Sequence, residues 1–369
     1  MPNRVRFTAF GNGGIMRRNL IANMTVMLIS CIVSLLIAEA FIRVFRGGDV
    51  DTAMLARRLE SVDVKTMMQP DPDPIIYYGL KPNLRVPWLG TVIFTDARGW
   101  RVPVEPRNSH PDPFRLVVLG DSTPFGWNVN FEDAYPDLVR KGLETRLGRP
   151  VELINTAVPG YNAWQYERLF ETRIVPLNPD LVILHYDHND LEPTSSFQPS
   201  DFLAPEYGDN FLHSALYKFT VRSIRIARNE AQKRRLVGDY ERVAEYIVSG
   251  RLYDEHMAAL GRLAAMAREH SIPVVAVIYN AYVRLDPDYR DHAIYRRLHE
   301  SKATFLEASG YHVIDLYPPY QRALEERGWM DLREWWNSAI DPLDAHPNPD
   351  GHRFIADYVL DGIRALPLH

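Results

Sequence analysis

The sequence predicts an α/β fold in which helices cover both faces of a parallel sheet. Two observations predict it. From about residue 115 onward, short apolar runs alternate with segments of helical periodicity, as in repeated βαβ units. These runs are apolar at nearly every position, which is typical of strands buried on both sides. A chain of 369 residues is long enough for such a domain and for additions to it.

The expected elements follow one another in a regular order. Strands are expected at 115–119, 151–154, 181–184, 273–278 and 312–316, and helices at 133–147, 163–174, 251–270, 292–309 and 351–365. Gly148 supports one boundary, since glycine commonly ends a helix. Between residues 191 and 250 the alternation breaks, and the basic segment 213–235 is either a solvated helix or a lid or membrane-surface helix.

The N-terminal part has a different pattern. No charged residue occurs between Arg18 and Glu39. As a helix, these 20 uncharged positions span about 30 Å, the thickness of a hydrocarbon core. The predicted organisation is a cytoplasmic tail (1–18), a transmembrane anchor (19–45), a proline-rich lead-in (46–112) that contains a β-prone run at 91–94, and the α/β domain (113–369) with the insertion 191–250. We expect the α/β domain to be periplasmic or extracellular.

Two other interpretations of the apolar segment stay open. A lipoprotein signal would place a lipid on Cys31, although the residues after it remain apolar. A cleaved signal peptide would use the small-x-small sequence at 38–40.

Composition excludes several classes of protein and site. Cys31 is the only cysteine, which excludes intramolecular disulfides and cysteine-based metal sites. The net charge is −5, and no basic stripe with interleaved aromatic residues occurs. A nucleic-acid partner is therefore not expected.

Residues that can carry chemistry follow the expected strands. Ser122 follows the first strand, Gly160 lies in the loop after the second, Asn189 follows the third, and Asp344 and His346 precede the last helix. Ligands bind beyond the carboxyl ends of the strands in an open parallel sheet. We therefore expect these residues to meet at one edge of the sheet.

These residue types suit acyl transfer. A serine hydroxyl becomes a good nucleophile when a histidine accepts its proton, and a carboxylate can hold the other imidazole nitrogen. The backbone N–H groups of Ser122 and Gly160 and the side-chain amide of Asn189 can donate hydrogen bonds to the oxyanion of a tetrahedral intermediate.

Four blocks of sequence resemble those of the SGNH (GDSL-type) hydrolases, in particular bacterial membrane-anchored members. They are Gly120-Asp121-Ser122, Gly160, Asn189-Asp190 and Asp344-Ala345-His346. The resemblance covers roughly residues 115–366 and implies a flavodoxin-like three-layer α/β/α fold and ester hydrolysis without metal or organic cofactor. It implies Ser122 as the nucleophile and His346 as the general base, with Asp121, Asp190 and Asp341 in supporting positions.

Two positions depart from the family pattern. The third block usually begins with glycine, where this chain has Asp187. The acid usually stands three residues before the histidine, where this chain has Leu343. Residues i and i+2 of an extended segment face the same side, so Asp344 can reach His346, and Asp341 is its rival.

Some polar residues near the blocks are interpreted as structural. Asp121 could cap the turn that follows it, and Asn348 and Pro349 fit the N-cap and first position of the last helix. His352 is interpreted as part of that helix. The group His185, Asp187 and His188 is interpreted as scaffold at a strand end rather than as a metal site.

The sequence thus predicts a serine esterase that acts on an O-acyl group, such as acetyl on an envelope carbohydrate or a short lipid ester. One alternative is an O-acyltransferase on cell-envelope polysaccharide that uses the same residues. The other is a catalytically silent binding domain, against which the complete set of four blocks argues.

Overall fold

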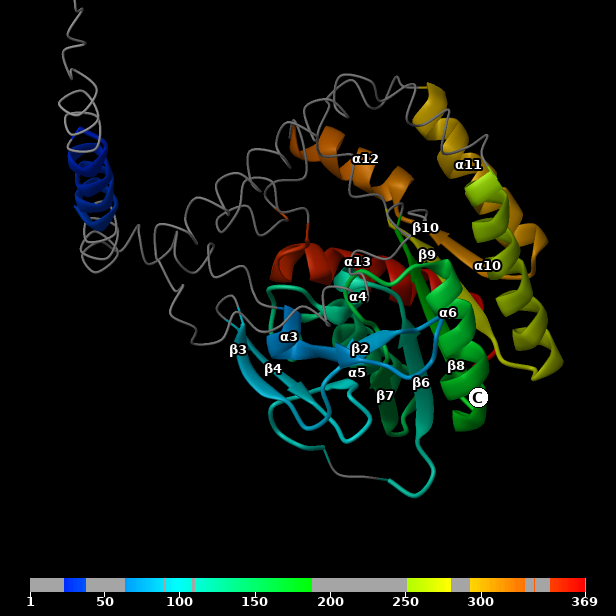
Figure 1. Ribbon diagram of the computed structural model, residues 1–369. Helices are drawn as coiled ribbons and strands as arrows, with labels where there is room; N and C mark the ends of the chain where they lie inside the picture. Colours follow the sequence, from blue (N-terminus) through cyan, green and yellow to red (C-terminus); the bar gives the residue numbers. More distant parts are fainter. Residues whose placement is uncertain are drawn as a thin grey trace, which may run out of the picture. The chain divides into compact units, whose positions relative to one another are not determined.

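A computed structural model describes residues 23–37, 64–88, 91–107, 110–187, 251–279, 293–328, 335 and 346–368. The chain divides into two compact units, Met1–Leu59 with Glu206–Arg235, and Glu60–Pro205 with Leu236–His369. The described part of the first unit is a helix at 23–37. All other described residues belong to the second unit, which contains the α/β domain (Figure 1).

The helix at 23–37 has no charged residue, and its large apolar side chains are 47% to 65% exposed. Within the described ranges, no helix has both the length and the apolar character that crossing a membrane requires. The anchor expected at 19–45 therefore stays a prediction.

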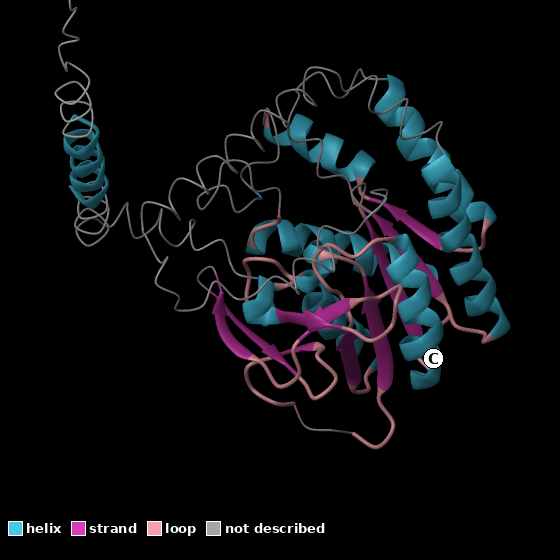
Figure 2. Ribbon diagram, viewed as in Figure 1, coloured by secondary structure: helices cyan, strands magenta, loops and turns pink. Residues whose placement is uncertain are grey.

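A sheet of eight strands, counted over the described ranges, forms the centre of the α/β domain (Figure 2). Five of its strands are parallel and run in the order β10-β9-β8-β6-β7. They are β6 (Phe114–Leu119), β7 (Val151–Asn155), β8 (Leu181–Tyr186), β9 (Val274–Ile278) and β10 (His312–Asp315). The sequence prediction of five parallel strands is confirmed, with boundaries that differ by one or two residues.

Helices cover both faces of this sheet (Figure 1). On one face lie α5 (Tyr135–Leu147), α12 (Tyr317–Arg327) and α13 (Pro349–Gly362), and on the other α6 (Ala163–Leu169), α10 (Arg251–Glu269) and α11 (Ala293–Ala308). Side chains of β6 alternate between the two cores: Leu116 and Val118 pack with the first group, Val117 and Leu119 with the second. Shorter helical segments are α4 (Ser122–Phe125), Phe131–Asp133, Phe170–Ile174, Val175–Leu177 and Ile363–Ala365.

The lead-in adds an antiparallel part to the predicted parallel sheet, so the whole sheet is mixed. The strands β5 (Arg101–Val102), β4 (Thr91–Thr95) and β3 (Arg85–Trp88) continue the sheet beyond β7. The β-prone run at 91–94 is part of β4 and pairs with β3 as a hairpin. A separate small sheet follows α3 (Val64–Met67) and consists of β1 (Met68–Pro70) and β2 (Tyr78–Leu80).

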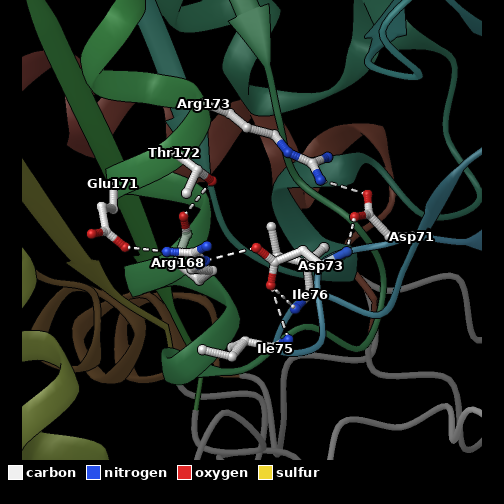
Figure 3. A network of polar contacts seen from close by, with 8 residues as sticks. All are labelled: Asp71, Asp73, Ile75, Ile76, Arg168, Glu171, Thr172 and Arg173. Atoms are coloured by element: carbon white, nitrogen blue, oxygen red, sulfur yellow. Dashed lines mark hydrogen bonds and ion pairs between the residues drawn. The ribbon is translucent and has the colours of Figure 1, made fainter.

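Ion pairs join the loop between β1 and β2 to the helix that follows β7 (Figure 3). Arg168 Nε lies 2.7 Å from Asp73 Oδ2, and Arg173 Nη2 lies 2.6 Å from Asp71 Oδ2. Burial raises the pKa of Asp73, but the hydrogen bond from Arg168 and those from two backbone N–H groups outweigh it and hold this pKa below its ordinary value. The lead-in is therefore packed onto the α/β domain.

Candidate active site

Ser122 lies at the point of the sheet where the order of the strands reverses. The strands that follow β6 in the sequence lie on opposite sides of it, β7 on one side and β8 on the other. Ligands of open α/β sheets bind at such a switch point, beyond the carboxyl ends of the strands. Ser122 comes three residues after the end of β6 and is the first residue of the short helix α4.

His346 meets Ser122 from the far end of the chain. Its Nε2 lies 2.7 Å from Ser122 Oγ, although 224 positions separate the two residues. Both side chains are half-buried. Asn348 fixes the start of the helix that follows, because its Oδ1 accepts hydrogen bonds from the N–H groups of Asp350 and Gly351. This N-cap, with Pro349 in the first turn, confirms the sequence prediction.

Asp121 does more than cap the turn. Its Oδ1 accepts from the Thr123 N–H at 3.2 Å, as an N-cap residue does. Its Oδ2 also lies 3.2 Å from Ser122 Oγ. The hydroxyl has one proton, and His346 is the closer of its two acceptors. Asp121 thus offers the hydroxyl an alternative partner beside the imidazole.

Two backbone N–H groups are available at this edge of the sheet. Within the described part of the chain, neither Ser122 nor Gly160 donates its N–H to another group. Gly160 has φ 80°, a conformation that favours glycine. Its turn is tied to the lead-in, since the Tyr78 hydroxyl donates to the carbonyl of Pro159 at 3.0 Å. A hydrogen bond from the Val158 N–H to the carbonyl of Gly120, at 3.1 Å, joins the loop before Gly160 to the loop 120–121 between β6 and α4, here called the serine loop.

Four of the site residues expected from the sequence lie outside the described ranges. They are Asn189, Asp190, Asp341 and Asp344. His188 also lies outside them, whereas Asp187 is a buried residue at the end of β8. The described residues therefore bring together Ser122, His346 and Asp121, with the loop that carries Gly160 linked to them.

Two tryptophans that no sequence pattern predicts lie beside His346. The ring of Trp127 lies 5.6 Å from that of His346, at an interplanar angle of 33°. Trp88, at the end of β3, meets Trp127 edge to face at 5.1 Å. These tryptophans belong to no helical or strand periodicity in the sequence, because Trp127 lies in a turn and Trp88 in the lead-in. Their only sequence signal is that Trp127 stands five residues after the serine.

A layer of buried rings lies behind the serine loop. A Cβ atom on Gly120 would lie 3.0 Å from the Cβ of His185, and the His185 ring lies 5.4 Å from that of Tyr135. Tyr135 also stacks on His352, whose Nδ1 accepts the Tyr135 N–H at 3.2 Å. Burial lowers the pKa of His185 to about 4, against an opposing effect of Asp187. Burial, together with Arg101 and two other histidines, lowers that of His352 to about 3. Both histidines are therefore neutral near pH 7.

No metal site is evident in the residues that the structure covers. Within them, no three histidine, cysteine or carboxylate side chains lie close enough together to hold an ion.

Comparison with solved structures gives similarities of low identity. A Parabacteroides merdae protein described as a GDSL-like lipase has 12% identity and a TM-score of 0.41, over 70% of this chain and 98% of its own. An acetylxylan esterase of Geobacillus stearothermophilus has 15% identity and a TM-score of 0.41, over 68% and 94%. The esterase EstA of a Pseudoalteromonas species has 13% identity and a TM-score of 0.39, over 68% and 97%. Likeness at this level bears on neither the mechanism nor the substrate.

The family match is stronger. No curated protein matches the sequence. The model of the GDSL-like lipase/acylhydrolase family, however, matches residues 118–354, which is more than half of the chain and includes Ser122 and His346. The chain therefore belongs to the GDSL-like lipase/acylhydrolase family.

Proposed function

We propose that the protein is a serine esterase that hydrolyses O-acyl esters through an acyl-Ser122 intermediate, with His346 as the general base. The observation that carries this proposal is the 2.7 Å contact between Ser122 Oγ and His346 Nε2 at the switch point of the sheet. This distance is within the range over which a base accepts the proton of its nucleophile.

The reaction has two halves. In the first, Ser122 Oγ attacks the ester carbonyl carbon while His346 Nε2 takes the hydroxyl proton. The tetrahedral intermediate expels the alcohol, which receives that proton from His346. In the second half, His346 takes a proton from water, the resulting oxygen attacks the acyl carbon, and the carboxylic acid leaves as Ser122 regains its proton.

Charge develops on the carbonyl oxygen in both halves. The N–H groups of Ser122 and Gly160 have no other partner in the described ranges, which suits an oxyanion hole. We assign a third donor to the side-chain amide of Asn189, from its place after β8. Asp344, or its rival Asp341, is assigned to accept a hydrogen bond from His346 Nδ1. This bond fixes the tautomer in which Nε2 carries no proton and can accept the one from Ser122.

The substrate and the location belong to the same proposal. We propose an acetyl group on an envelope carbohydrate, or a short lipid ester, as the acyl donor. The apolar segment 19–45 would hold the enzyme at a membrane, with the α/β domain periplasmic or extracellular. The uncharged sequence between Arg18 and Glu39 supports this.

A fluorophosphonate probe tests the mechanism, since it phosphonylates a serine that an adjacent base activates. We expect one label per chain, on the peptide that contains Ser122, and no label on Ser122→Ala. His346→Ala should slow labelling by several orders of magnitude. Arg98→Met, on an exposed turn of the lead-in, serves as the control and should be labelled normally. Labelling that survives Ser122→Ala would refute the proposal.

A further inference from the structure

Arg101 is a buried arginine outside the segment that the family model matches. It lies on β5, is 1% exposed, and pairs with Asn155 at the end of β7. Asn155 in turn donates from Nδ2 to the carbonyl of Pro124 at 2.9 Å. The strand β5 therefore places a guanidinium group directly against the helix that begins with Ser122.

The guanidinium group contacts three backbone carbonyls of one turn. Nη1 donates to the carbonyls of Phe125 and, at 2.7 Å, of Gly126, and Nη2 donates to that of Val129 at 2.7 Å. Phe125 is the last residue of α4, and the end of a helix leaves carbonyls without a helical partner. The Gly126 carbonyl also accepts the N–H of Val129 at 3.2 Å. The backbone of the turn also approaches the guanidinium group closely at Gly126. Gly126 has φ 82°, and a Cβ atom there would lie 2.5 Å from Arg101 Nη1.

This turn supports both members of the proposed catalytic pair. The carbonyl of Ser122 accepts the N–H of Trp127 at 3.0 Å, so the serine and the turn are one hydrogen-bonded unit. The Trp127 ring, in turn, packs against the His346 ring. A shift of the turn would therefore move the nucleophile and the contact surface of its base together.

Burial of this arginine carries a cost, although its guanidinium also lies over the Phe125 ring, 4.7 Å from the centroid. No carboxylate forms an ion pair with it among the residues that the structure describes, and a buried charge without such a partner is costly. Burial lowers its pKa to about 10, with a smaller opposing effect of Glu132, so the group is still a cation at neutral pH. Charge-assisted hydrogen bonds are stronger than neutral ones and hold the turn more firmly than a neutral donor would.

We propose that Arg101 is a positioning residue, which fixes the turn 125–129 and thereby holds Ser122 and His346 in reactive geometry. The inference rests on the acyl-serine mechanism proposed above and assigns a role in it to the lead-in.

The test compares Arg101→Met with a matched variant, Arg146→Met. Arg146 also donates to three carbonyls, those of Ile363, Arg364 and Leu366, but from the last turn of α5. Misplacement of reacting groups by about 1 Å can cost about 100-fold in rate. We expect Arg101→Met to lower kcat and the rate of fluorophosphonate labelling per folded molecule by about 10- to 100-fold, with KM within about twofold. Arg146→Met should keep both rates within about twofold.

Amide hydrogen exchange of the full-length chain measures how firmly the turn is held, independently of the catalytic reaction. Arg101→Met should speed amide exchange in the peptide that spans Ser122 to Trp127, whereas Arg146→Met should not. If Arg101→Met does not fold, Arg101→Lys replaces it, because an ammonium group keeps the charge but cannot reach three carbonyls as a planar fork does. A folded variant with wild-type labelling or unchanged exchange in this peptide would overturn the inference. Labelling of Ser122→Ala would instead refute the acyl-serine mechanism, and the exchange result would still decide whether Arg101 fixes the turn.

Discussion

The two histidines behind the serine loop should make the fold sensitive to acid. His185 and His352 are fully buried, and both ring nitrogens of His185 and the Nε2 of His352 have no hydrogen-bond partner in the described ranges. Their pKa values in the folded chain are about 4 and about 3, below the ordinary value of about 6.5. The stability that their neutral forms contribute is therefore complete above about pH 6.5 and is lost as the pH falls toward the folded-state values.

The size of the loss follows from these values. At pH 5 the unfolded chain protonates both histidines, whereas the folded chain leaves both mostly neutral. Each pH unit below about 6.5 lowers the free energy of unfolding by about 1.4 kcal/mol per histidine, so each contributes a loss of about 2 kcal/mol at pH 5. Together they remove about 4 kcal/mol, a large part of the 5–15 kcal/mol that is typical of a folded domain.

Urea unfolding of the full-length chain at pH 8 and pH 5, followed by tryptophan fluorescence, measures this loss. His352→Asn keeps an acceptor for the Tyr135 N–H, and His185→Phe keeps a ring beside Tyr135. Each variant should lose about 2 kcal/mol less between the two pH values than the wild type does. His270→Gln removes an exposed histidine and serves as the control. If His352→Asn and His185→Phe lose as much stability as the wild type, the two histidines are not neutral when buried, and the reasoning fails.

Three further predictions concern the acid, the anchor and the acceptor. Asp344→Asn should lower turnover by several orders of magnitude, since the tautomer of His346 is then no longer fixed, whereas Asp341→Asn should be mild; the opposite ranking in kcat would transfer the role to Asp341. A chain that begins near Gly48 should be soluble and active on a small aryl ester, and mass spectrometry of the full-length chain would reveal a lipid on Cys31 if the lipoprotein alternative holds. The acyl-enzyme formed from an aryl acetate should decay quickly in buffer alone; a long-lived acyl-enzyme that only an envelope oligosaccharide discharges would identify a transferase.

The parallel part of the fold could be predicted because its strands are continuous apolar runs. Leu181 to Leu184 are all fully buried, and so are most residues of β9, since both faces of the sheet are covered. That pattern requires no knowledge of distant contacts. The sequence does not predict the helix α12, because its first turn contains Pro318 and Pro319. Two prolines favour a turn, although proline is tolerated at a helix start.

The antiparallel extension could not be predicted in the same way. Its strands are two to five residues long, too short to establish a period of two. Arg101 and Arg98 stand three positions apart in one turn-rich stretch, yet the side chain of Arg101 is buried against the turn 125–129 and that of Arg98 is 50% exposed. Nothing in the local sequence predicts which of the two arginines is buried. The difference arises only when β5 pairs with β7.

The proposed catalytic residues could be predicted from the sequence, whereas the residues of the lead-in that pack beside them could not. Ser122 and His346 were found because each adjoins an element with a clear sequence pattern, an apolar strand in one case and a capped helix in the other. Arg101 and Trp88 come from a segment that precedes the family match, and they contact Gly126 and Trp127 respectively. If the turn after the serine depends on them, a chain cut to the matched segment would keep both proposed catalytic side chains but lose what fixes their relative position. Removal of the lead-in should therefore reduce kcat more than removal of the N-terminal apolar segment does.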